Sequence, residues 1–262
     1  MPELPEVNTF KRYFDETSLN QVIDKVVVHD DKIIRNVSGS TFARRLKHRQ
    51  FIDSYRRGKY LFAHLDNGHH VLFHFGMTGD LAYYADNAVG PKHERFVIQF
   101  ANGYRLGFDC PRKFARILYL DDLTAYLEEV GLGEDALTIP QKSFLQLMEG
   151  RKGAIKGFLL NQQLVAGVGN LYADEICFQT RIHPASRVDK LSLAQRKAIY
   201  KKMKSILKLA VKREAHYKAY PKDWFWEWRK EGAIGPENSK VEKATIAGRS
   251  TFFCQGYQIN YQ

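Results

Sequence analysis

The sequence has little cysteine, and its three thiols, Cys110, Cys177 and Cys254, stand far apart in 262 residues. An odd and widely spaced set does not build a disulfide framework, so we expect a protein of a reducing compartment. The chain also lacks a long apolar run, which excludes a membrane-spanning helix, and its first residues are too polar for a signal peptide. Internal repeats and low-complexity segments are missing as well. We therefore expect a cytoplasmic protein without a membrane partner.

Acidic residues are the minority charge. Forty Lys and Arg stand against 29 Asp and Glu, which leaves a net charge of +11 that is spread along the chain. Positive charge dispersed over a folded protein most simply indicates a polyanionic partner, and nucleic acid is the usual one.

Hydrophobic periodicity divides the chain into two parts. Residues 3–17 have the spacing of an amphipathic helix, and from about 22 to 120 short β-like runs alternate with turn residues such as Asn-Gly, as in a sandwich or barrel. Helical periodicity follows from about 138 to 215 and ends in a basic helix from Leu193 to Lys212. The periodicity predicts an α+β fold with a β-rich domain at 1–120, a linker at 121–135, a helical domain at 136–216, and an aromatic loop with a hairpin at 217–262.

The opening residues, Met-Pro-Glu-Leu-Pro-Glu-Val, carry the strongest chemical signal. Loss of the initiator Met1 would leave Pro2 as a free secondary amine, with Glu3 and Glu6 within one helical turn. A terminal amine has a pKa near ~8, so part of it is neutral and nucleophilic at pH 7. Its attack on an aldehyde-like carbon gives a cationic iminium, as in lysine Schiff-base enzymes. The structural alternative is an extended tail that leads into a helix with Pro5 in its first turn.

Two further segments carry features that suit phosphate binding. Residues 167–175 form a glycine-rich turn that runs into a helix, whose free N–H groups can bind an anion, and Asn170 there can cap the helix or reach a phosphate. The turn at 56–59 projects Lys59 as a cation. Each feature alone is common in ordinary turns, but both occur here in a protein of strong positive charge.

Two loops, 74–79 and 109–114, contribute a different set of side chains. They offer Met77, Arg112 and Phe114, two large apolar groups and a cation. Apolar wedges of this kind enter a base stack, and an enzyme that modifies a base must extrude it and fill the gap. As single features they are ordinary loop and core residues; together with a phosphate clamp they indicate a wedge.

These motifs resemble those of the Fpg/Nei family, formamidopyrimidine-DNA glycosylase and endonuclease VIII. The resemblance runs nearly from end to end, and the matching stretches are Pro2 to Val7, Arg57 to Leu61, His74 to Gly79, Lys152 to Lys156, Val165 to Glu175 and Ala247 to Thr251. It implies that residues 1–120 are a catalytic domain with an N-terminal helix and a β-sandwich, and that residues 136–216 are a DNA-binding helix–two-turn–helix domain. A β-hairpin finger follows. The implied function is a monomeric bifunctional DNA glycosylase and AP lyase of base excision repair, which acts on damaged double-stranded DNA at the nucleoid of a bacterial cell.

The resemblance also implies a role for each matching residue. Pro2 is the nucleophile that attacks the deoxyribose C1′, Glu3 is the acid/base, and Glu6 supports the N-terminal geometry. Lys59 acts near the damaged nucleotide and its phosphates. The implied DNA contacts are Asn170, Arg249, Lys152, Lys156 and His74, and the residues implied to fill the gap after base flipping are Met77, Arg112 and Phe114.

The hairpin departs from the zinc finger of most bacterial members, which has the form C-x2-C-x16-C-x2-C. Cys254 matches the third ligand, but the other three positions hold Ile234, Glu237 and Tyr257. A single cysteine cannot hold a tetrahedral zinc ion. We therefore expect a zincless finger, no metal and no other cofactor, while Arg249 at the hairpin tip is retained.

The lesion itself is left open by the sequence. Members that excise 8-oxoguanine usually carry a long Gly/Thr-rich loop before the finger, and here residues 217–223 and a tryptophan cluster replace it. We do not expect efficient 8-oxoguanine recognition; oxidised pyrimidines, ring-opened purines, hydantoins and abasic sites all remain open, as do the opposite base and β- against β,δ-elimination. The alternative function is a catalytically silent protein that binds damaged DNA, although a pure binder has no need of Pro2 and Glu3.

Overall fold

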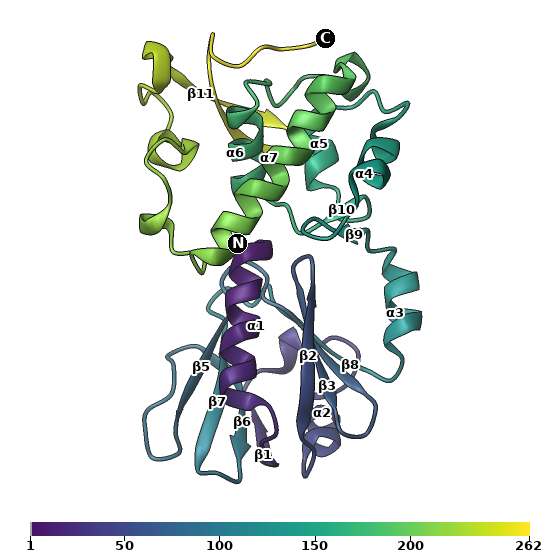
Figure 1. Ribbon diagram of the computed structural model, residues 1–262. Helices are drawn as coiled ribbons and strands as arrows, with labels where there is room; N and C mark the ends of the chain where they lie inside the picture. Colours follow the sequence, from purple (N-terminus) through teal and green to yellow (C-terminus); the bar gives the residue numbers. More distant parts are fainter. Residues whose placement is uncertain (1) are drawn as a thin grey trace. The chain divides into compact units, whose positions relative to one another are not determined.

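A computed structural model describes residues 2–262, which form two compact units that meet in sequence between Gly131 and Leu132 (Figure 1). Each unit is described by itself. The first combines a long helix with two sheets, and the second is mainly helical and ends in a hairpin. The predicted α+β class is confirmed. None of the helices in the described part of the chain is long and apolar enough to cross a bilayer.

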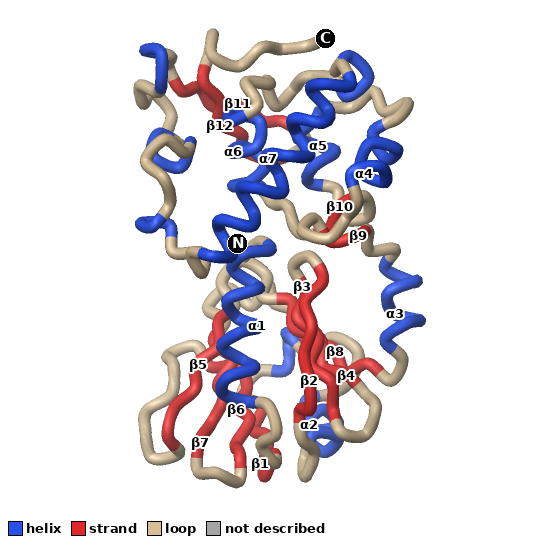
Figure 2. Tube along the Cα trace, in the orientation of Figure 1, coloured by secondary structure: helices blue, strands red, loops and turns tan. Residues whose placement is uncertain are grey.

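The first unit is built on two four-stranded antiparallel sheets (Figure 2). One has the order β1-β6-β7-β5 and the other the order β2-β3-β4-β8. The strands are β1 (Ile23–Val28), β2 (Phe51–Arg57), β3 (Tyr60–Leu65), β4 (His70–His74), β5 (Asp80–Ala85), β6 (Glu94–Phe100), β7 (Tyr104–Asp109) and β8 (Arg116–Leu120). The helices are α1 (Leu4–Ser18), α2 (Gly39–Leu46) and α3 (Leu123–Val130), with a 3-10 turn η1 (Asp31–Ile33).

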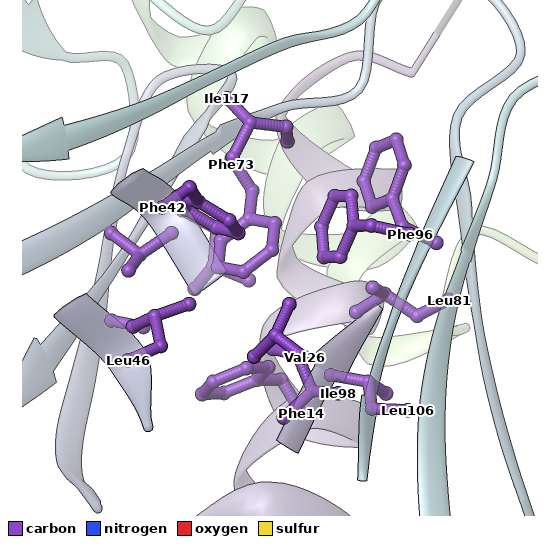
Figure 3. Close-up of a cluster of buried hydrophobic side chains, with 14 of the residues drawn as sticks. Phe14, Val26, Phe42, Leu46, Phe73, Leu81, Phe96, Ile98, Leu106 and Ile117 are labelled. Atoms are coloured by element: carbon purple, nitrogen blue, oxygen red, sulfur yellow. The ribbon is translucent and has the colours of Figure 1, made fainter. Parts of the chain in front are cut away.

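Large apolar side chains from both sheets and from α1 make one core (Figure 3). Phe14 of α1 lies edge-on to Phe51 of β2, with ring centroids 5.0 Å apart, and also contacts Phe73 of β4. On β6, Phe96 stacks on Phe108 of β7 at 5.3 Å. Because α1 is locked into this core, the residues at its N-terminus have a fixed position in the unit.

The second unit surrounds the central helix α6 (Asn170–Gln179). Its other helices are α4 (Gln141–Met148), α5 (Ile155–Leu160) and α7 (Leu193–Lys212), and its strands are the parallel pair β9 (Glu134–Asp135) and β10 (Val165–Ala166) and the hairpin β11 (Val241–Ile246) and β12 (Arg249–Cys254). Short 3-10 turns are η2 (Val188–Lys190), η3 (Tyr217–Ala219), η4 (Phe225–Trp228) and η5 (Pro236–Asn238). Helix α7 has the bounds that its periodicity predicts.

Residues 121–135 differ from the predicted linker. Asp122 caps α3, which ends at Gly131 in the left-handed conformation with φ 59°. Leu123, Tyr126 and Leu127 of α3 pack against the apolar cluster of Phe62, Leu72 and Leu120. The segment up to Gly131 therefore belongs to the first unit, and the second begins at Leu132 rather than at 136.

Candidate functional site

The N-terminal residues of α1 are held by a reciprocal capping interaction. The Glu3 side chain accepts a hydrogen bond from the Glu6 backbone N–H, and the Glu3 backbone N–H donates one to Glu6 Oε2 at 2.8 Å. Pro5 occupies the first turn, where the missing N–H has no cost. Glu3 is buried and Pro2 is half-buried, whereas Met1 lies outside the described residues. Glu6 thus fixes the backbone next to Pro2, which gives the predicted supporting role of Glu6 a physical basis.

Lys59 lies in the tight turn between β2 and β3, which pair through Arg57 and Tyr60. Gly58 has φ 57°, a conformation that favours glycine, and its carbonyl accepts from Arg56 Nη1 at 2.9 Å. Lys59 itself is buried. A cation in such a turn has little freedom to move, so it is pre-positioned.

His74 ends β4 opposite Arg116 of β8. Burial, together with the positive charges of Arg116 and Lys59, lowers the pKa of His74 to about 4. Its Nδ1 accepts from the Gly76 N–H at 3.3 Å, so the single proton of the neutral ring is placed on Nε2. At pH 7 the side chain is therefore a neutral hydrogen-bond donor, which suits a phosphate oxygen without adding a charge.

The two predicted wedge loops lie against each other. Gly76 has φ 62°, and a Cβ atom there would lie 2.4 Å from the Phe114 carbonyl. The Arg112 N–H donates to Thr78 Oγ1 at 3.3 Å, and the Arg112 guanidinium lies 5.1 Å from the centre of the Phe114 ring. The structure thus brings Arg112 and Phe114 together beside the loop of Met77.

Exposure sets this cluster apart from the core. Met77 is 40% exposed and Phe114 is 53% exposed, in contrast to the many buried rings of the same unit. Arg95 anchors the loop at 109–114, because its guanidinium donates hydrogen bonds to the carbonyls of Cys110 and Pro111. Exposed apolar tips on a fixed base are what a wedge requires.

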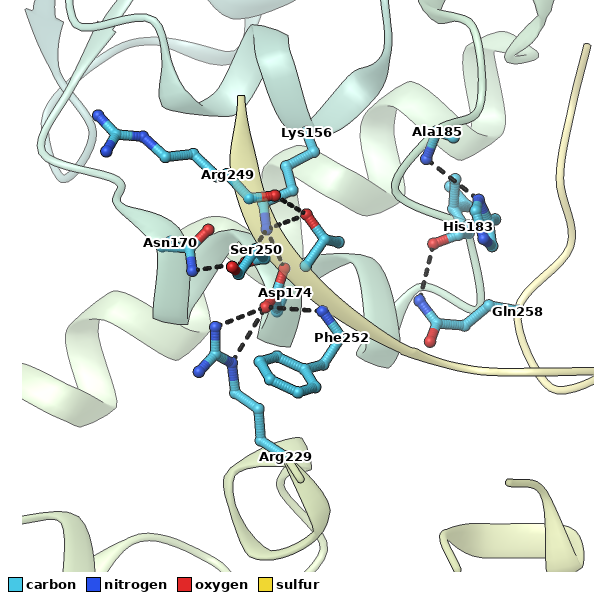
Figure 4. A network of polar contacts seen from close by, with 12 residues as sticks. Lys156, Asn170, Asp174, His183, Ala185, Arg229, Arg249, Ser250, Phe252 and Gln258 are labelled. Atoms are coloured by element: carbon cyan, nitrogen blue, oxygen red, sulfur yellow. Dashed lines mark hydrogen bonds and ion pairs between the residues drawn. The ribbon is translucent and has the colours of Figure 1, made fainter. Parts of the chain in front are cut away.

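In the second unit, Asn170 begins α6 and touches the hairpin (Figure 4). One of the two roles predicted for Asn170 was to cap the helix. The N-cap is Gly169, so Asn170 does not have that role. Its Nδ2 donates to the Ser250 carbonyl at 2.9 Å, and its buried Oδ1 has no partner among residues 2–262. Arg249, next to Ser250, is exposed. The tight turn before it has positive φ at both Ala247 and Gly248, 51° and 70°, as short hairpins require.

The expectation that Lys156 contacts DNA is wrong. Its side chain is completely buried, and its Nζ lies 2.6 Å from Asp174 Oδ1 and 2.7 Å from Thr251 Oγ1 (Figure 4). Arg229 completes the network through two bonds to Asp174 Oδ2, at 2.8 and 3.0 Å. Lys156 therefore joins α5, α6 and the hairpin. Lys152, in contrast, is exposed, and its contact with DNA stays a prediction.

Apolar side chains, rather than a set of metal ligands, fill the base of the finger. Cys254 is buried with Phe178, Phe225 and Val241. Tyr257, at the fourth zinc-ligand position, stacks on Phe178 at 5.1 Å, and Glu237, at the second, pairs with Arg181 at 2.6 Å. One thiol with these neighbours does not fit tetrahedral zinc. Across residues 2–262, no group of three or more His, Cys, Asp or Glu is placed to hold a metal ion.

Sequence reasoning missed the polar partners of α6. Tyr172, Asp174 and Glu175 bind Tyr220, Arg229 and the backbone of Phe225, respectively. The sequence signal was the placement of two carboxylates in the middle of a largely apolar helix. Buried carboxylates need partners, but the sequence does not say which.

Comparison with known proteins follows the same division into units. The formamidopyrimidine-DNA glycosylase N-terminal domain matches residues 1–117, and the formamidopyrimidine-DNA glycosylase H2TH (helix–two-turn–helix) domain matches residues 132–220. A formamidopyrimidine-DNA glycosylase of Arabidopsis thaliana is 32% identical over 279 residues, which cover 100% of this chain and 72% of that protein. The enzyme of the same name from Hydrogenovibrio crunogenus is 30% identical over 276 residues, which cover 98% of this chain and 96% of that protein.

Solved structures agree with the sequence relatives. The Lactococcus lactis formamidopyrimidine-DNA glycosylase, non-covalently bound to DNA with an abasic site, superposes with a TM-score of 0.89 at 25% identity, over 98% of this chain and 99% of that one. The same enzyme with DNA that contains N7-benzyl-Fapy-dG gives a TM-score of 0.88 at 25% identity, with the same coverage.

Proposed function

Because the chain belongs to the formamidopyrimidine-DNA glycosylase family, and is thus a DNA repair glycosylase, we propose that it is bifunctional. It removes an oxidised base from double-stranded DNA and then cleaves the strand at the abasic site. The observation that carries the lyase half is the N-terminal Pro2-Glu3 pair on a helix whose first turn is locked by Glu6. A catalytically silent binder has no use for that arrangement.

The reaction begins when the Pro2 amine attacks C1′ of the damaged nucleotide and displaces the base. The C1′–O4′ bond then breaks as O4′ takes up a proton and the amine nitrogen loses its own, which leaves an iminium at C1′. This iminium acidifies the C2′ proton because it can accept the electron pair. Loss of that proton expels the 3′ phosphate by β-elimination. Buried Glu3 is the proton carrier in this proposal. The cationic iminium favours the carboxylate form of Glu3.

DNA is held through its phosphates and through the gap left by the extruded nucleotide. Asn170, fixed against Ser250, and exposed Arg249 supply an amide and a guanidinium side by side in the second unit. In the first unit, neutral His74 and Lys59 add a donor and a cation. Met77 and Phe114 are the proposed wedge, and Arg112 faces the orphaned base.

Borohydride trapping on an abasic-site duplex tests this proposal. Reduction of the iminium joins enzyme and DNA covalently, so mature wild-type protein yields an adduct of lower electrophoretic mobility. Pro2→Gly, which has no N-terminal secondary amine, should not yield this adduct. A mature wild-type protein that binds the abasic duplex but gives no adduct would establish the silent-binder alternative. Tyr104→Ala, a change on an exposed ring of the first unit, is the control that must still trap.

A lesion panel then defines the substrate. Incision of duplexes that carry 8-oxoguanine, formamidopyrimidine, thymine glycol, a hydantoin or an abasic site is compared under single-turnover conditions. We expect 8-oxoguanine to be a poor substrate, since residues 217–223 do not form the Gly/Thr-rich loop. Metal analysis of the same preparation tests the zincless finger: stoichiometric zinc would refute it.

A further inference from the structure

The segment between α7 and the hairpin carries a concentration of aromatic rings that the proposed chemistry does not use. Its members are Tyr217, Tyr220, Trp224, Phe225, Trp226 and Trp228. Three neighbouring positions of α6 hold the segment in place. The buried hydroxyl groups of Tyr172 and Tyr220 are hydrogen-bonded at 2.6 Å, and the Asp174 carboxylate accepts a hydrogen bond from the Arg229 guanidinium.

Glu175 supplies the third tether. Its buried carboxylate accepts from the backbone N–H groups of Phe225 and Trp226 and from Gln179 Nε2 at 2.7 Å. Burial raises the pKa of Glu175 to about 7, and these hydrogen bonds oppose that rise. A segment tethered at three points to one helix is a fixed element of the second unit rather than a free loop.

The 3-10 turn η4 sorts these rings into two sets. Residues i and i+3 of such a turn eclipse each other, and Phe225 and Trp228 both pack on Phe178, at 4.9 and 5.9 Å. Trp226 lies between them in sequence and points away from that core. It is 36% exposed, and its ring lies 4.5 Å from Tyr217 with 31° between the planes.

We propose that Tyr217 and Trp226, here called the aromatic platform, are the surface on which an unstacked nucleobase of the damaged DNA lies. The inference rests on the proposed function and deepens it. Rings held in place outside the core offer a π face, and every base has one to match. Helix α7 ends at Lys212, shortly before Tyr217, and has seven Lys and Arg residues and no acidic one. The platform therefore follows a helix that favours a polyanion.

Recognition by stacking implies a substrate class. The platform reads planarity and not the hydrogen-bonding edge, so planar oxidised pyrimidines gain affinity whatever their pattern of donors. A base with a saturated 5,6 bond is puckered and stacks poorly. An abasic site has no base and gains nothing.

The test compares three duplexes that differ only at the lesion: 5-hydroxyuracil, 5,6-dihydrouracil and an abasic site. Base–aromatic stacking is worth about 1–3 kcal/mol per base, so Trp226→Ala should weaken binding of the 5-hydroxyuracil duplex by roughly 5- to 150-fold. Binding and incision of the abasic duplex should be unchanged, and 5,6-dihydrouracil should lie between the two. Trp226→Phe keeps a ring and should restore most of the affinity.

The matched control is Tyr104→Ala in the first unit. Tyr104 is also exposed and stacks on Tyr83 at 5.0 Å, so it reports what loss of any surface ring does. An equal loss on all three duplexes, or no loss on any, would overturn the platform. If wild type neither incises nor traps the abasic duplex, the proposed function fails instead, and the binding preference for 5-hydroxyuracil and its loss in Trp226→Ala still decide the platform.

Discussion

At the scale of single residues, the surroundings decide what each ionisable group can do. Glu6 is committed to the backbone of Glu3, so it shapes the N-terminus rather than exchanging protons. His74 is neutral because it is buried beside two cations. Lys156 has lost contact with solvent altogether. Residue type alone would have assigned a chemical role to all three.

Removal of the Glu6 carboxylate should loosen the N-terminus. Glu6→Ala deletes half of the capping box, and loss of a cap costs about 0.5–2 kcal/mol. We expect a lower Tm and slower borohydride trapping, because the backbone beside Pro2 is no longer held. Glu16→Ala, an exposed carboxylate at the other end of α1, is the control; equal slowing in both variants would contradict the assigned role.

His74 should make the fold sensitive to acid. Its folded pKa, about 4, lies below the ordinary value of 6.5, so the unfolded state binds the proton more readily. The stability that neutral His74 contributes is therefore full above pH 6.5 and is lost as the pH falls from there toward 4. Urea unfolding midpoints measured from pH 7 to pH 4 should fall less steeply in His74→Gln than in wild type. Asn in place of exposed His48 should leave the wild-type slope intact.

At the scale of elements, α6 organises the second unit. Asn170 and Asp174 hold the hairpin, and Tyr172, Asp174 and Glu175 hold the aromatic segment that precedes it. One helix thus places both the proposed phosphate clamp and the aromatic platform. With aromatic rings packed at its base, the hairpin has a source of rigidity other than a metal.

Lys156→Met should separate this structural role from direct DNA binding. The change leaves the buried Asp174 carboxylate with one cation fewer, and breaking a buried pair costs about 3–5 kcal/mol. We expect a large drop in Tm together with weaker DNA binding. Arg249→Ala should weaken DNA binding at an unchanged Tm, because Arg249 is exposed. A Lys156→Met protein of wild-type stability would show that the network does not hold the hairpin.

At the scale of the whole molecule, the net charge of +11 governs how the protein meets DNA. Contacts with phosphates release counterions, so the logarithm of the affinity falls linearly with the logarithm of the salt concentration. For an undamaged duplex, Arg249→Ala should reduce the magnitude of that slope by about 0.9, the contribution of one phosphate contact. Arg12→Ala, on the exposed face of α1, should leave the slope unchanged.

Local patterns predicted much of the architecture. Asn-Gly turns located the hairpins, and a run of periodic residues located α7 with its observed bounds. Helix α3 was missed because its acidic residues and the nearby Gly131 and Gly133 are typical of a linker. Its apolar residues matter only through the cluster around Phe62, which is formed by distant strands.

The sequence by itself determined the family and led to the proposed chemistry, because Pro2, its neighbour Glu3 and the order of the motifs can all be read locally. Only the tertiary structure decided which side chains are available to a partner. Lys156 meets Asp174 eighteen residues later and Thr251 ninety-five residues later, and Trp226 is left outside while Phe225 enters the core. Burial is a property of contacts between segments far apart in the chain, so no local pattern contains it.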